Sequence, residues 1–406
     1  MDTGDMEIAA ALDVFYRRWH LLEQKMGASG GSVIDFDFAR PHARMWADRP
    51  YESRWEALQE LEHLRHHVAS TSWCNPSFLN EKLAGASAYL RALQGERLPF
   101  GEYVRATMGF IPVEVPEAEV ATRRAELVEG LRREGFTFDA AGYSAYREVM
   151  GLKDLSRFEE ELRREVIHWM GRLEELSSLR VEPRFRVEAV DLDAYWANWV
   201  DGGRDSGIRL RANIHPRIEY YQTSASTLAA HEIAGHAAQV LLCVDSPEVD
   251  ASSLNVTVHS CEAYHMEGLA QIALQLLARP GEISQALLLR EELAEYHQMV
   301  MNNAHMALER GEHLTDVVAD VLRRCPFVSS LSARNGLRDR MNNPLFRSYL
   351  FVYGPSKTFF KRALKLGPVG LRWFLQQVYC SFQTPTQLEV TLKEAMARDG
   401  RGEGLL

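Results

Sequence analysis

Cysteine is scarce in this sequence. The 406 residues include only five, an odd number, at widely separated positions and with no Cys-x-x-Cys pair. A disulfide framework is normally built from an even set of cysteines in a short secreted chain. We therefore expect reduced, buried thiols rather than disulfide bonds.

Basic charge and long apolar runs are lacking too. Lysine and arginine number 46 against 56 aspartates and glutamates, a net charge of −10, which is the wrong sign for binding nucleic acid. No stretch approaches the roughly 18 apolar residues of a membrane span, and the N-terminus has acidic residues where a signal peptide needs basic ones. We expect a cytoplasmic protein with neither nucleic-acid nor membrane partners.

The hydrophobic pattern changes once along the chain. From about residue 7 to 180, apolar residues recur at three- and four-residue spacing, which is typical of helices. RFRVEAVDL and GIRLRANIH, after residue 184, alternate in the two-residue rhythm of strands before helical patterns return. These patterns predict a mainly α, two-lobed protein with a small antiparallel β-sheet: a helical scaffold lobe at 1–180 and a second lobe at 181–406.

The most informative segment is HEIAGH, in which His231 and His236 are five residues apart. In a regular helix such positions point about 140° apart, so the two imidazoles would not reach one cation. A local widening to i→i+5 hydrogen bonding, a π-bulge, brings them onto one face. Gly235 would ease that distortion. The spacing predicts a mononuclear metal site on the helix at 226–243.

A zinc site of this kind needs a third protein ligand, and a carboxylate from a nearby helix is a common one. Glu267, in MEGLA, is a carboxylate within an otherwise apolar helical pattern and is the first candidate. Glu262, five residues earlier, is the competing ligand. Alternatively, because it lies five residues before Glu267, Glu262 would accept an N–H from a metal-binding imidazole without touching the metal, and so fix the tautomer of that histidine.

HEIAGH together with MEGLA resembles the gluzincin metallopeptidases that pair HExxxH with a downstream EGLA-type glutamate, the tubulin tyrosine carboxypeptidases and their bacterial QEGLA-motif relatives. More loosely, it resembles dipeptidyl peptidase III and a broad family of bacterial peptidases with a GHxxQ ending. The resemblance covers about residues 208–272. Met266 stands where the bacterial relatives have glutamine, and Gly235 where they have threonine.

The resemblance implies a gluzincin-like fold in which His231, His236 and Glu267 bind one Zn²⁺ and Glu232 is the general base. The chemistry is consistent on its own terms, because a carboxylate next to a zinc-binding histidine points beside the water that zinc activates. Two histidines and one carboxylate also suit Fe²⁺, the less expected alternative.

Peptide hydrolysis also requires a donor for the oxyanion of the tetrahedral intermediate. Tyr353, in SYLFVYGPSK, is the first choice, with Tyr349, Tyr220, Tyr221 and His215 as competitors.

Substrate-binding candidates come from two segments. The polar face of the strand at 208–215 carries Arg209, Arg211 and His215, and this strand would lie antiparallel to an extended substrate. The run RNGLRDRMNNPLFRS is first interpreted as a solvated helix face or as charges at a helix C-terminus. The alternative is a clamp for an anionic group, with Arg338 and Arg347 as its candidates.

The functional expectation is a zinc metallohydrolase that cleaves an amide or peptide bond, in the manner of a carboxypeptidase, with a peptide or small amide as substrate. Two alternatives stay open. One is a metal-dependent enzyme, hydrolase or non-haem iron oxygenase, acting on a small non-peptide metabolite, because folds do not determine substrates. The other is a non-catalytic metal-binding relative.

Overall fold

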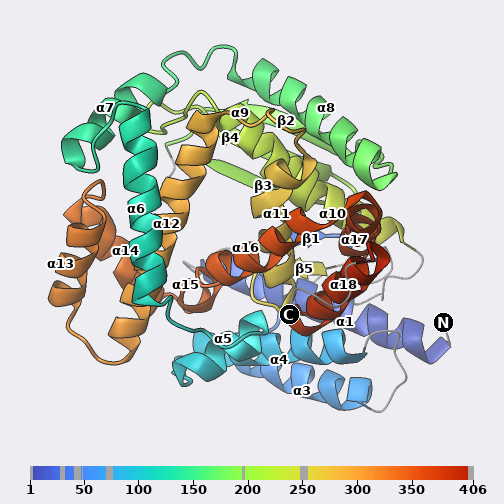
Figure 1. The fold of residues 1–406 in the computed structure, drawn as a ribbon. Helices are drawn as coiled ribbons and strands as arrows, with labels where there is room; N and C mark the ends of the chain where they lie inside the picture. Colours follow the sequence, from blue (N-terminus) through green and yellow to red (C-terminus); the bar gives the residue numbers. More distant parts are fainter. Residues whose placement is uncertain are drawn as a thin grey trace.

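The computed structural model describes residues 3–27, 33–40, 47, 49–69, 76–193, 197–246 and 255–400. Over these residues the protein is mainly helical and has one small sheet among the helices (Figure 1), which confirms the predicted fold class. No helix in these ranges combines the length and the apolar character that a bilayer span requires.

The N-terminal part is helical, as its periodicity predicts, apart from one short strand. Its helices are α1 (Thr3–Met26), α3 (Arg54–Ala69), α4 (Pro76–Leu93), α5 (Phe100–Met108), α6 (Glu117–Arg133), α7 (Ala140–Met150) and α8 (Phe158–Ser177). The strands are β1 (Ile34–Asp37), β2 (Phe185–Val190), β3 (Asn198–Gly203), β4 (Gly207–Asn213) and β5 (Asn255–Thr257).

After the sheet, one continuous helix consists of α9 (Ser224–Leu228), the π-helical segment η1 (Ala229–Ala237) and α10 (Ala238–Asp245). The helices that follow are α11 (Glu262–Leu277), α12 (Gln285–Glu309), α13 (Leu314–Arg324), α14 (Ser330–Asn342), α15 (Pro344–Tyr349), α16 (Tyr353–Lys361), η3 (Arg362–Lys365), α17 (Pro368–Cys380) and α18 (Pro385–Arg398). Several begin at side-chain caps, among them α18, where Thr384 and Gln387 form a capping box.

The sheet is mixed rather than wholly antiparallel, with strand order β2-β4-β3-β1-β5. β3 and β4 form an antiparallel hairpin, whereas β2 runs parallel to β4 and β1 runs parallel to β3. The predicted alternation in β4 is confirmed: Ile208, Leu210 and Ala212 are buried, and Arg209 and Arg211 lie on the opposite face. β1 comes from a distant part of the chain, whereas β2 and β4 are separated only by β3. Strand periodicity encodes neither the partner of a strand nor its direction.

Three clusters of buried apolar side chains form the core. The largest encloses η1 and α10, and it joins Ile233 to Leu210 of the sheet and Phe360 of α16. The second packs α1, α3 and α4, and the third packs α6 against α12, α13 and α14. Each cluster draws on residues from both sides of position 180. The division into lobes at that residue stays a prediction.

Two glycines let α11 approach its neighbours closely. A Cβ on Gly235 would lie 2.8 Å from both Cα and Cβ of Ala270, so η1 and α11 pack at this distance only because the side chain is absent. A Cβ on Gly268 would lie 2.5 Å from the Phe360 ring of α16. α11 is therefore held tightly between η1 and α16.

Candidate metal centre

The π-helical segment places the two histidines of HEIAGH on one face. η1 extends from Ala229 to Ala237, and the ring centroids of His231 and His236 lie 4.9 Å apart at an interplanar angle of 84°. The widening predicted from the five-residue spacing is therefore present. Gly235 also has a packing role at the η1–α11 contact, which the sequence did not suggest.

Glu267 of α11 completes a three-residue group with these histidines. Nε2 of His231 lies 3.8 Å from Oε2 of Glu267, and Nε2 of His236 lies 3.7 Å from Oε1. One ligand atom from each residue falls within 4.8 Å of the others. Zinc ligands about 2.1 Å from a tetrahedral ion are roughly 3.4 Å apart, so a small inward movement of these side chains would close the shell.

The protonation and hydrogen bonding of this triad suit a cation. Burial lowers the pKa of His231 to about 4 and that of His236 well below its ordinary value, so both imidazoles are neutral at pH 7 and have a lone pair for a metal. Oε2 of Glu267 and Nδ1 of His236 are buried and have no hydrogen-bond partner among the residues that the structure describes. A bound ion would compensate the buried carboxylate.

Glu262 lies elsewhere. Its carboxylate is wholly buried and pairs with the equally buried Nζ of Lys82, at 2.9 and 3.0 Å, and it accepts the backbone N–H of Thr257 at 2.8 Å. Lys82 also donates to the carbonyl of Asn255. Glu262 therefore ties α11 to α4 and β5, and the structure brings only Glu267 of the two glutamates to the histidines.

Glu232 is buried beside the triad, with 8% of its surface exposed. Burial and the negative charge of Glu267 raise its pKa to about 8, against a hydrogen bond that Nδ2 of Asn198 donates to its Oε1 at 2.6 Å. Asn198 begins β3 and orients this carboxylate. Sequence reasoning missed it, because a single asparagine in AYWANWV carries no signal of its distant partner.

Of the five oxyanion-donor candidates, Tyr349 and Tyr353 are close to the triad. The Tyr349 hydroxyl donates to Oε1 of Glu267, and the Tyr353 ring lies 5.7 Å from that of Tyr349, centroid to centroid. The hydroxyl of Tyr220 instead donates to the carbonyl of Ala197. Tyr221 contacts the hydroxyl of Tyr143, and the Nδ1 atom of His215 accepts the backbone N–H of Arg217 in the turn after β4.

A cavity of about 620 Å³ lies beside the triad, of which His231 is the member that lines it. His231 and Tyr353 line it, together with residues of α11, α12 and α16 that include Gln271, Asn302 and Lys357. Its volume suits a ligand the size of a short peptide.

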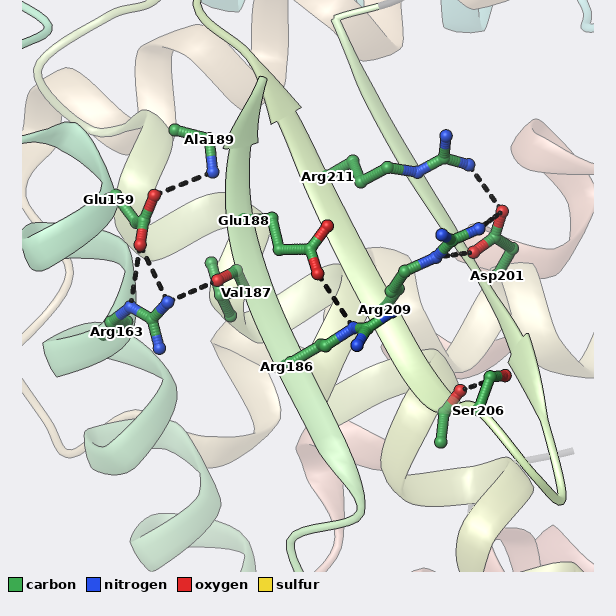
Figure 2. A network of polar contacts seen from close by, with 11 residues as sticks. Glu159, Arg163, Arg186, Val187, Glu188, Ala189, Asp201, Ser206, Arg209 and Arg211 are labelled. Carbon is green, nitrogen blue, oxygen red and sulfur yellow. Dashed lines mark hydrogen bonds and ion pairs between the residues drawn. The ribbon is translucent and has the colours of Figure 1, made fainter.

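The predicted substrate-binding arginines have other contacts. Arg209 and Arg211 both pair with Asp201 of β3 across the face of the sheet (Figure 2), beside a second cavity of about 400 Å³. The β4 backbone is hydrogen-bonded on both sides, to β2 and to β3, so it has no free edge for an extended substrate.

The two candidates of the Arg-rich run differ from each other. Arg347 is buried and holds Glu309 with two hydrogen bonds of 2.7 and 3.0 Å, so its charge is neutralised within the protein. Arg338 is exposed on α14. Neither lines the cavity at the triad.

No protein-family model matches this chain, and no curated protein matches its sequence significantly. A solved structure from Colwellia psychrerythraea, provisionally described as a lipoprotein, is similar with a TM-score of 0.57 and 12% identity over 85% of this chain, which spans 61% of that protein. A lipoprotein of unknown function from Shewanella oneidensis, also described provisionally, gives a TM-score of 0.50 and 13% identity, covering 87% of this chain and 75% of the other. Trypanosoma cruzi metallocarboxypeptidase 1 gives a TM-score of 0.40 and 11% identity, covering 99% of this chain and 93% of the other. At these identities the first two similarities establish a shared fold and nothing about activity.

Proposed function

We propose that this protein is a zinc-dependent hydrolase of amide bonds, a metallopeptidase that acts at the C-terminus of small peptides. The observation that carries the proposal is the π-helical turn, which directs His231 and His236 toward Glu267 and leaves Glu232 beside them. A helix with only a structural role does not require a π-helical turn, two neutral imidazoles and two buried carboxylates at one place.

Zn²⁺ would be held by His231, His236 and Glu267, and it would supply the Lewis acidity that makes water easier to deprotonate and polarises a carbonyl. The protein fits this ion, because the donor set is two imidazoles and one carboxylate, a combination common at catalytic zinc.

Glu232 would take a proton from the attacking water as its oxygen bonds to the carbonyl carbon of the substrate. It would then pass that proton to the amide nitrogen as the C–N bond breaks, which yields a carboxylic acid and an amine and consumes one water. Asn198 keeps one oxygen of Glu232 engaged and so directs the other. The Tyr353 hydroxyl, at the cavity wall, would donate a hydrogen bond to the oxyanion.

Elemental analysis of the protein purified without added metal tests the site. The expected result is about one zinc per chain, lost in His236→Ala and in Glu267→Ala. Iron in place of zinc would contradict the hydrolase and favour oxygen-dependent chemistry at the same ligands. Absence of bound metal even after zinc addition would overturn the site altogether.

Hydrolysis assays test the reaction. Glu232→Gln should keep its zinc and lose turnover of peptides and N-acyl amino acids, whereas Glu174→Gln, an exposed glutamate on α8, should behave as the wild type. Full turnover by Glu232→Gln would exclude it as the base. Stoichiometric zinc without hydrolysis by the wild type across such a panel would favour a non-peptide metabolite as substrate or a non-catalytic role.

A further inference from the structure

Arg340 of α14 is a buried cation that has no counter-ion among the described residues. Only 4% of its surface is exposed, and in the part of the chain that the structure describes its one hydrogen bond runs from Nη1 to Oδ1 of Asn302, at 3.3 Å. Within the described ranges no carboxylate forms an ion pair with it. Arg347, seven residues later, is equally buried but grips Glu309 with two hydrogen bonds. A buried charge is normally paired, so Arg340 needs an explanation.

The charge of Arg340 persists at neutral pH. Burial lowers its pKa to about 10, still well above 7. The neighbouring imidazoles of His297 and His305 are neutral at this pH. Burial and then the charge of Arg340 lower the pKa of His297 to about 4, and burial also lowers the pKa of His305. The guanidinium therefore keeps its positive charge, and no anionic side chain among the described residues pairs with it.

Arg340 lies next to the cavity at the triad. Asn302, its hydrogen-bond partner on α12, lines that cavity together with His231 and Tyr353. Oδ1 of Asn302 accepts from both Arg340 and Gln298, at 3.3 and 3.2 Å. Within the described residues, the Nδ2 group of Asn302 donates no hydrogen bond, so its N–H groups can be offered to a ligand in the cavity. The amide of Asn302 thus forms part of the cavity wall, and the guanidinium of Arg340 lies directly behind it, one hydrogen bond away.

We propose that Arg340, with the amide of Asn302, binds the carboxylate of the substrate and so selects peptides or N-acyl amino acids with a free C-terminus. This inference deepens the proposed function and rests on it. Two of the five guanidinium N–H groups suffice for a bidentate pair with a carboxylate, a geometry that lysine does not reproduce. The substrate would supply the missing counter-ion, and binding would remove the cost of the unpaired charge.

A matched pair of substrates tests the assignment: an N-acyl dipeptide with a free C-terminal carboxylate and the same compound as its C-terminal amide. Wild type should prefer the carboxylate by about 100-fold in kcat/KM, because an amide leaves the buried charge unpaired. Arg340→Gln and Arg340→Lys should lose that preference, largely through KM on the carboxylate. Arg323→Gln, exposed on α13, should retain it.

Two further measurements separate recognition from structure. Because its charge is unpaired, Arg340→Gln should leave Tm unchanged or raise it, whereas a purely structural arginine would lower Tm. By calorimetry, an N-acyl amino acid should bind the Glu232→Gln variant and lose at least about tenfold in affinity when Arg340→Gln is added.

The outcomes distinguish the two proposals. If wild type cleaves neither compound, the hydrolase fails, and the calorimetry still decides the role of Arg340. If wild type cleaves acid and amide equally, or if Arg340→Gln keeps the preference and the affinity, the hydrolase stands and this inference is wrong. A preference lost in Arg338→Gln instead would return the role to the exposed arginine of the same helix.

Discussion

The hydroxyl of Tyr349 donates a hydrogen bond to Oε1 of Glu267, the oxygen that faces His236. The tyrosine comes from α15 and the glutamate from α11, 82 residues apart in the sequence. Burial raises the pKa of Glu267 to about 7, and the hydrogen bond from Tyr349 partly opposes that rise. The same contact holds the carboxylate toward both imidazoles. A tyrosine behind a metal ligand acts on the position and basicity of that ligand rather than on the substrate.

Tyr349→Phe should therefore weaken zinc binding by about tenfold, because Glu267 loses the contact that orients it. Competition with a chromophoric chelator measures the affinity. Turnover at saturating zinc should fall much less. An unchanged zinc affinity would mean that the α11 backbone alone positions Glu267.

Tyr353→Phe should have the opposite profile. Its hydroxyl is proposed to meet the oxyanion, so kcat should fall by about 100-fold while zinc content and affinity stay as in the wild type. Steady-state kinetics beside metal analysis of the same preparation provide the check. Loss of zinc with retained kcat per bound zinc would exchange the roles of the two tyrosines.

Glu262→Gln should retain one zinc per chain and lose stability. The variant leaves the wholly buried Lys82 without its carboxylate, at a cost of about 3 kcal/mol in the free energy of unfolding. Urea unfolding measures that change. Glu267→Gln is the matched comparison, because it should lose zinc and unfold at nearly the wild-type denaturant concentration in metal-free buffer. A folded Glu262→Gln protein without zinc would make Glu262 a ligand.

Acid should weaken the contact between Glu309 and Arg347. Burial opposes ionisation of Glu309, but the nearby His305 ring and the hydrogen bonds and charge of Arg347 outweigh it and lower its pKa to about 2. A carboxyl with a depressed pKa in the folded state stabilises the protein above its unfolded pKa, near 4.5, and loses this contribution as the pH falls toward 2.

Glu309→Gln should accordingly reduce stability at pH 7 by about 2 kcal/mol, a value discounted for solvent screening, and the difference from wild type should shrink below pH 4.5. Urea unfolding at pH 7, 5, 4 and 3.5 follows the trend. A difference that stays constant over this range would show that the charge of Glu309 does not stabilise the fold.

The local features of this protein could be predicted from sequence because they depend on neighbours along the chain. The five-residue spacing of His231 and His236 predicted the π-helical turn, since only a widened helix directs both imidazoles to one side. Alternation of apolar and polar residues predicted β4. An isolated carboxylate in an apolar helix marked Glu267, although Glu262 had the same composition around it.

Packing between distant segments decided the rest. The choice between Glu262 and Glu267 depended on Lys82 of α4, and the orientation of Glu232 on Asn198 of β3. The parallel pairing of β3 with β1 likewise needed a strand from the N-terminal half.

The Arg-rich run at 334–348 shows most clearly what could not be predicted from sequence. Sequence singled out Arg338 and Arg347, but the rotation of α14 against α12 turns Arg338 to solvent and buries Arg340, while Glu309 already neutralises Arg347. Which arginine keeps an unpaired charge is set by the acidic side chains that the fold brings within a few ångströms. Residue type and spacing determine which groups can bind an ion or a carboxylate, and only the tertiary structure determines which of them are still available to do so.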